Sequence, residues 1–160
     1  MPKSNIISVT KRCCTQPFVI VGCLIEKNGK FLLVKEGGKW NQPAGWLELR
    51  EDIIRGAQRE VEEETGLQIK ITGFLGVYNL IKQKKEKTLH AIKFIFLAKS
   101  INDKIKSEKA LEKNWFTAKK IQALKNQLWD MDVLKEIEDY TKGSIYPLEI
   151  FSSFTDLSNS

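Results

Sequence analysis

Acidic side chains are concentrated between Glu51 and Glu64, and their types and spacing could support metal binding and proton transfer. Glu60, Glu63 and Glu64 are three and four positions apart, so in a helix they would project from one face. Neighbouring carboxylates repel one another unless a cation lies among them, and Mg²⁺ or Mn²⁺ prefers oxygen ligands. The pattern predicts a divalent-cation site, although a solvated acidic helix face would have the same composition.

The acidic stretch contrasts with the rest of the chain. Residues 45–67 contain seven acidic residues and three arginines, a net charge of −4, whereas the whole 160-residue chain has a net charge of +6. A basic remainder suits an anionic substrate. Because the lysines are scattered and interleaved with acids, no specific binding of nucleic acid is expected.

A helix is predicted to begin at Glu51 or Asp52 and to end at Gly66. Carboxylates favour the free N–H groups of a first turn, and glycine is expected where the chain becomes left-handed after a helix. Apolar residues at helical spacing predict the face that packs on the core; they are Ile54, Ala57 and Val61. The acidic face would then lie at the edge of that core.

Strands are predicted on both sides of this helix. The apolar run 18–25 indicates a buried strand, and Asn28-Gly29 predicts a tight turn into a second strand at 31–34. Three later strands are expected at 68–79, 88–98 and 112–116, with the lysine-rich run 82–87 as a hairpin tip. Two helices follow at 118–124 and 130–141, the last with the inner face Met131, Leu134 and Ile137.

The spacing of the acidic stretch resembles the Nudix box. Gly45 is followed after five residues by Glu51, and after seven more by Arg59-Glu60. Val61, Glu63-Glu64 and Gly66-Leu67 complete the match at each specified position. The chain therefore resembles the Nudix hydrolase family. This resemblance implies an α/β fold, in which an α/β/α sandwich surrounds a mixed β-sheet and the box forms a loop-helix-loop.

A second resemblance concerns the flanking segments. The sequence 40–45 (Trp-Asn-Gln-Pro-Ala-Gly) and the tail 146–151 resemble the NudJ-type branch of Nudix phosphatases over most of residues 17–154. Trp46 stands where that branch often has histidine. We therefore expect one Nudix domain at 17–154, a flexible N-terminal arm at 1–16 and a short tail at 155–160. Cys13, Cys14 and Cys23 lack metal-ligand spacing and are expected to be reduced thiols.

The resemblance implies roles for the box residues. Metal ligands would be Glu60, Glu63, Glu64 and the carbonyl oxygen of Gly45, with Mg²⁺ or Mn²⁺ as the cofactor. Glu63 or Glu64 is the expected general base within the box. Arg59 would orient Glu63 and Glu51 through charge-assisted hydrogen bonds. Some family members supply one more carboxylate from a later segment, for which Glu108 and Glu112 are the candidates.

Residues outside the box are candidates for contact with the substrate. Lys35, Lys39 and Lys93 are on segments that could border a pocket, although each could equally be a surface lysine. Ring stacking is the hypothesis for four aromatic residues, and core packing is the alternative for each; they are Trp40, Trp46, Tyr78 and Trp115.

The expected function is metal-dependent hydrolysis of phosphoanhydride bonds in nucleoside di- and triphosphates and related organic pyrophosphates, including hydroxymethylpyrimidine pyrophosphate. A dinucleoside-polyphosphate or RNA-cap pyrophosphohydrolase is the alternative enzyme. A non-catalytic nucleotide sensor on a Nudix scaffold is the alternative of another class. We expect a cytoplasmic protein, because residues 1–16 lack an apolar signal region and the run 18–25 is too short to span a membrane. The expected oligomeric state is a monomer or a homodimer.

Overall fold

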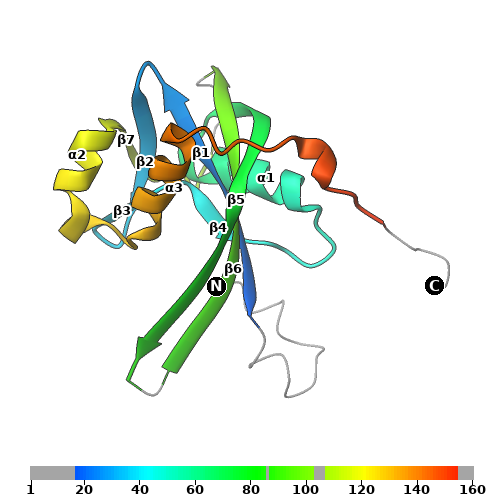
Figure 1. Cartoon of the computed structure of the whole chain (residues 1–160), viewed down its shortest axis with the longest axis horizontal. Helices are drawn as coiled ribbons and strands as arrows, with labels where there is room; N and C mark the ends of the chain where they lie inside the picture. Colours follow the sequence, from blue (N-terminus) through cyan, green and yellow to red (C-terminus); the bar gives the residue numbers. More distant parts are fainter. Residues whose placement is uncertain (1–16, 86, 103–106, 155–160) are drawn as a thin grey trace.

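The computed structural model describes residues 17–85, 87–102 and 107–154 (Figure 1). The expected arm at 1–16, with Cys13 and Cys14, and the expected tail at 155–160 lie outside the described residues. Cys23 is buried and free. None of the described helices is long and apolar enough to cross a membrane.

A mixed sheet of seven strands forms the centre of the fold. Its main order is β3-β2-β1-β6-β5, with β4 beside β1 and β7 beside β2. β1 and β6 run parallel, and the other pairs are antiparallel. The strands are β1 (Phe18–Lys27), β2 (Lys30–Glu36), β3 (Lys39–Asn41), β4 (Ala44–Trp46), β5 (Gln68–Lys84), β6 (Lys87–Asn102) and β7 (Glu112–Thr117).

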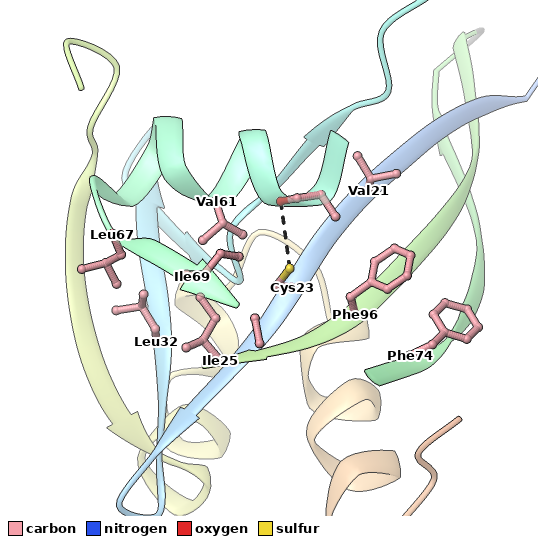
Figure 2. Close-up of a cluster of buried hydrophobic side chains, with 11 residues drawn as sticks. Val21, Cys23, Ile25, Leu32, Val61, Leu67, Ile69, Phe74 and Phe96 are labelled. Carbon is pink, nitrogen blue, oxygen red and sulfur yellow. Dashed lines mark hydrogen bonds between the residues drawn. The ribbon is translucent and has the colours of Figure 1, made fainter. Parts of the chain in front are cut away.

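Helices cover both faces of this sheet, so the predicted α/β/α sandwich is confirmed. α1 (Ile53–Thr65) packs on the face that carries Val21, Cys23 and Ile25, and Figure 2 shows Val61 of α1 directed toward these side chains. α2 (Ala118–Ala123) and α3 (Asp132–Thr141) cover the face that carries Leu24. This alternation follows from the two-residue period of a strand. Two 3-10 helices complete the fold, η3 (Lys125–Gln127) and η4 (Leu148–Ile150).

The ends of α1 are fixed by the predicted residues. The Asp52 carboxylate accepts hydrogen bonds from the amides of Ile54 (3.0 Å) and Arg55 (3.1 Å), which satisfies two N–H groups of the first turn. Gly66 ends the helix with a φ of 67°. The helix that carries the acidic residues is therefore capped at both ends, and its geometry fixes their spacing.

The β5–β6 hairpin is longer than predicted. Strand pairing continues beyond 79 and begins before 88, since Gln83 pairs with Thr88 and Lys84 with Lys87. Figure 1 shows these two strands projecting beyond the rest of the sheet. Most of the lysine-rich run thus belongs to strands, because the alternation of side chains allows charged residues on the solvent side of a ribbon.

The inner face of α3 was predicted wrongly at one position. The helix begins at Asp132, so Met131 precedes it and is 55% exposed. The buried side chains of α3 are those of Val133, Glu136 and Ile137, at the spacing of one helix face. An acid therefore lies on the face that was expected to be apolar.

The segment after α3 returns to the sheet. Gly143 follows the helix with a φ of 83°, as predicted for its stop. The backbone of Tyr146 exchanges two hydrogen bonds with Phe74 of β5 (2.8 and 2.9 Å). Phe151 then packs its ring on Phe74 and Phe96, with centroids 4.8 and 5.2 Å apart. The segment 146–151 thereby covers the same face of the sheet as α1.

Candidate active site

Arg59 links the predicted acidic residues. Its Nε and Nη2 donate to the two carboxylate oxygens of Glu51, at 2.6 and 2.9 Å. Its Nη1 donates to Glu60 at 2.8 Å and to Glu63 at 3.5 Å, and Nη2 also donates to the carbonyl oxygen of Trp46 at 3.1 Å. The hydrogen bond from Arg59 lowers the pKa of Glu51. Arg59 thus aligns three carboxylates, and its contacts with Glu51 and Glu63 are those expected for it.

Glu60 lies against the backbone of Gly45. A Cβ atom added at Gly45 would be 2.3 Å from the carboxylate carbon of Glu60, so no side chain fits there without displacing Glu60. Burial raises the pKa of Glu60, and Arg59 opposes this only in part. The first glycine of the box and the first glutamate of its acidic face therefore meet in space.

Glu64 is the third carboxylate of the acidic face of α1 and is half-buried. Burial raises its pKa to about 8, and the neighbouring charge of Glu60 adds to the shift. One oxygen accepts a hydrogen bond from the amide of Ala44 at 3.1 Å. Because burial raises the pKa of both Glu60 and Glu64, this site favours a positive charge beside them.

Glu63 occupies a more exposed position. Its carboxylate accepts a hydrogen bond from Lys109 Nζ at 2.9 Å, and its carbonyl oxygen accepts one from Ser107 Oγ at 2.5 Å. The contact with Glu63 raises the pKa of Lys109. The sequence did not indicate this contact, because Lys109 is 46 residues from Glu63 along the chain.

A cavity of about 220 Å³ opens beside Glu64. It is bordered by Gly45 and Trp46 of β4 and by Lys93 of β6. The Trp46 ring also packs edge-on against Phe18, with centroids 4.6 Å apart. The remaining lining residues are Ile20, Val34, Glu36, Lys39, Asn41, Gln42, Ala44, Leu80, Lys82, Leu89, Trp129, Asp130 and Asp132. The cavity thus joins the box to the face covered by α3.

Four candidate substrate residues do not line this cavity: Lys35, Trp40, Tyr78 and Trp115. Trp40 is only 7% exposed and packs edge-on against Phe116 in the core (4.9 Å between centroids). Lys35 lies 5.3 Å above the Trp40 ring and forms an ion pair with Glu112 at 3.5 Å. Core packing, the alternative considered for the aromatic residues, describes Trp40, and Lys35 covers it from outside.

Lys93 lines the cavity, but its charge is already balanced. Its Nζ donates to Asp132 at 2.6 Å and to Glu136 at 2.7 Å, and its side chain is 2% exposed. Burial lowers the pKa of Lys93, but the two carboxylates outweigh this effect and raise it above its ordinary value. Lys93 is therefore a protonated lysine in a buried cluster rather than an available ligand for phosphate.

The additional carboxylates of the cavity come from other segments than predicted. Glu112 is occupied by Lys35, and neither Glu108 nor Glu112 borders the cavity. Glu36, at the end of β2, lines it together with Glu64, and its charge contributes to the raised pKa of Glu64. Glu36 directly precedes Gly37 and Gly38, which form the turn between β2 and β3.

The oxygen donors of the box are of the type that a hard divalent cation prefers, but their side chains do not converge on one point. Within residues 17–85, 87–102 and 107–154, no three acidic, histidine or cysteine side chains converge closely enough to hold a metal ion. The Arg59 guanidinium instead holds Glu60 and Glu63. The raised pKa values of Glu60 and Glu64 indicate where a cation would be favourable.

Comparison with known proteins gives the family. The family model described as the NUDIX domain matches residues 16–137. The chain belongs to the Nudix hydrolase family. As a Nudix hydrolase it is an enzyme that cleaves pyrophosphate bonds, and members of this family generally use divalent metals.

Relatives of this Nudix hydrolase support the assignment along most of its length. It is 34% identical to "Phosphatase NudJ" of Escherichia coli (strain K12), over 87% of this chain and 93% of that protein. It is similar to the solved "NUDIX hydrolase from Nitrosomonas europaea", with a TM-score of 0.77, 32% identity and coverage of 87% and 98%. A MutT protein from Methanosarcina mazei Go1 shares the fold, with a TM-score of 0.65, 24% identity and coverage of 80% and 96%.

Proposed function

We propose that this Nudix hydrolase cleaves phosphoanhydride bonds of nucleoside di- and triphosphates and related organic pyrophosphates in a reaction that requires Mg²⁺ or Mn²⁺. One observation carries the proposal: Glu60 lies half-buried against Gly45, and Glu64, held by the amide of the adjacent Ala44, borders a cavity of about 220 Å³. Such a volume suits a small ligand, and buried carboxylates suit a divalent cation.

The box residues supply the groups for this chemistry. A bound divalent cation neutralises phosphate oxygens and lowers the pKa of water. Glu60, Glu63, Glu64 and the carbonyl oxygen of Gly45 are the proposed ligands. Arg59 positions the carboxylates through the contacts already described. Glu63 and Glu64 are the candidate general bases. We favour Glu64, because it lines the cavity and Glu63 does not.

Trp46 is the candidate substrate residue best supported by its position. It borders the cavity directly after Gly45, where an aromatic ring could contact the organic part of a pyrophosphate. The similarity to NudJ phosphatase supports adding hydroxymethylpyrimidine pyrophosphate to the substrates to be tested. Because members of the family act on many different substrates, the test uses a panel of candidate substrates.

The test is hydrolysis of a panel that contains nucleoside di- and triphosphates, dinucleoside polyphosphates and pyrimidine pyrophosphates, with Mg²⁺ and with chelator. We expect metal-dependent turnover of mononucleotides or pyrimidine pyrophosphates. Glu63→Gln and Glu64→Gln should each lower kcat about a hundredfold or more. Glu62→Gln is the matched control, because its carboxylate accepts a hydrogen bond from Gln58 and does not line the cavity.

The outcomes separate the alternatives. Cleavage of dinucleoside polyphosphates alone would replace the proposal with the alternative enzyme. Nucleotide binding without turnover would indicate the sensor. Wild-type rates in both Glu63→Gln and Glu64→Gln would show that the assigned site is wrong.

A further inference from the structure

Trp129 lies on the rim of the cavity and was not among the predicted site residues. It is 47% exposed although it is large and apolar. Its position is nevertheless fixed, because its amide donates to the carbonyl oxygen of Trp40 at 2.8 Å. A Cβ atom at Gly37 would lie 3.3 Å from Cζ3 of its indole, so the ring packs against the turn between β2 and β3. A held aromatic ring at a cavity rim suits stacking of a flat ligand.

Hydrogen-bond acceptors lie in the same part of the cavity. Asn41 Oδ1 and Asp132 Oδ1 are shielded from solvent and have no donor among the described residues. Both residues line the cavity. A carboxylate can only accept, so Asp132 requires an N–H or O–H group from elsewhere. An unpaired buried acceptor is costly, and a ligand that brings a donor would remove that cost.

The charges of this part do not favour phosphate. Lys93 is balanced by Asp132 and Glu136, and Lys82 forms an ion pair with Asp130 at 2.5 Å. Lys82 and Lys93, two of the three lysines that line the cavity, are thus already paired with carboxylates. Phosphate groups would instead be favoured beside the box, where the proposed metal ligands lie. The organic group of the substrate then falls on the side of α3.

We propose that Trp129 and Asp132 bind the organic group of the substrate, and that this group is a flat nitrogen heterocycle with an exocyclic amino group. Trp129 stacks on the ring and Asp132 accepts a hydrogen bond from the amino group. This inference rests on the function proposed above, because it assumes a pyrophosphate bound at the box. Trp129 would be a second aromatic residue, besides Trp46, in contact with the substrate. Its place at the cavity follows from the fold and was not predicted from the sequence.

Steady-state hydrolysis of cytidine diphosphate and of an alkyl diphosphate tests the role of Trp129. Trp129→Ala should raise KM for cytidine diphosphate, and the ratio of kcat/KM between the two substrates should fall about tenfold or more. Trp129→Phe should restore most of this ratio. Met131→Ala is the matched control, because Met131 is exposed, apolar and close in sequence but does not line the cavity. An unchanged ratio in Trp129→Ala would overturn the proposal.

The wild-type enzyme tests the role of Asp132 without any variant. It should prefer cytidine diphosphate to uridine diphosphate by about tenfold in kcat/KM, the effect of one hydrogen bond to a charged group. Asp132→Asn should reduce this preference. Equal kcat/KM for the two nucleotides in the wild type would overturn the assignment of Asp132.

Failure of the proposed function would look different. If no diphosphate is hydrolysed, titration calorimetry with α,β-methylene cytidine diphosphate and Mg²⁺ still decides the ring site. Binding weakened about tenfold or more by Trp129→Ala would support it. Equal binding by wild type and variant would overturn it.

Discussion

Gly45→Ala should separate activity from stability. The added Cβ atom would lie 2.3 Å from the carboxylate carbon of Glu60, whereas ordinary van der Waals contact begins at 3.4 Å. The carboxylate must therefore move by the difference, 1.1 Å. A misplacement of about 1 Å can reduce the rate about a hundredfold. We therefore expect kcat to fall by about that factor, and the Mg²⁺ concentration needed for half-maximal activity to rise.

The fold should tolerate this substitution. The group that moves is the end of a flexible side chain, and Gly45 is not among the glycines with positive φ. The control is Gly29→Ala at the tip of the β1–β2 hairpin, where φ is 74° and no atom is within 4 Å. It should lower the unfolding free energy by about 1–2 kcal/mol and leave kcat unchanged. Hydrolysis assays and urea denaturation measure both quantities. Wild-type kcat and Mg²⁺ dependence in Gly45→Ala would refute the reasoning.

Three further predictions concern charged side chains. Arg59→Lys keeps the charge but loses the paired contact with Glu51, so kcat should fall about tenfold and the unfolding free energy by about 1–2 kcal/mol; equal values would contradict the positioning role. Lys93→Met should destabilise the protein by about 3–5 kcal/mol in urea, against less than about 1 kcal/mol for Lys82→Met, whose ion pair is more exposed. Burial raises the pKa of Glu136 from 4.5 to about 7, so its contribution to stability is present below about pH 4.5 and lost as pH rises through about 7. The unfolding free energy of the wild type, relative to that of Glu136→Gln, should therefore decrease between these two pH values. A difference that stays constant with pH would contradict this prediction.

The box could be predicted because its information is local. Asp52 and Gly66 define the ends of α1, and the spacing of its glutamates places them on one face. The hairpin turn at Asn28 and Gly29 was equally predictable, and both residues have positive φ. Such features depend on the backbone preferences of single residues, which sequence alone contains.

The substrate side of the cavity could not be predicted in the same way, because it depends on contacts between distant segments. Lys93 and Glu136 are 43 residues apart, yet they form a buried ion pair. One sequence pattern could have indicated it: Val133, Glu136 and Ile137 share a helix face, so Glu136 lies in an apolar stripe. Trp129 had no such pattern, since its place depends on the turn at Gly37.

The most direct test of the central claim is equilibrium binding of Mn²⁺, measured by electron paramagnetic resonance, to the wild type and to Glu64→Gln, with Glu62→Gln as control. If the carboxylates of α1 hold the catalytic cation, the wild type and the control bind Mn²⁺ alike, and Glu64→Gln binds it about tenfold or more weakly. Equal affinity in all three proteins, or no binding by the wild type, would contradict the account.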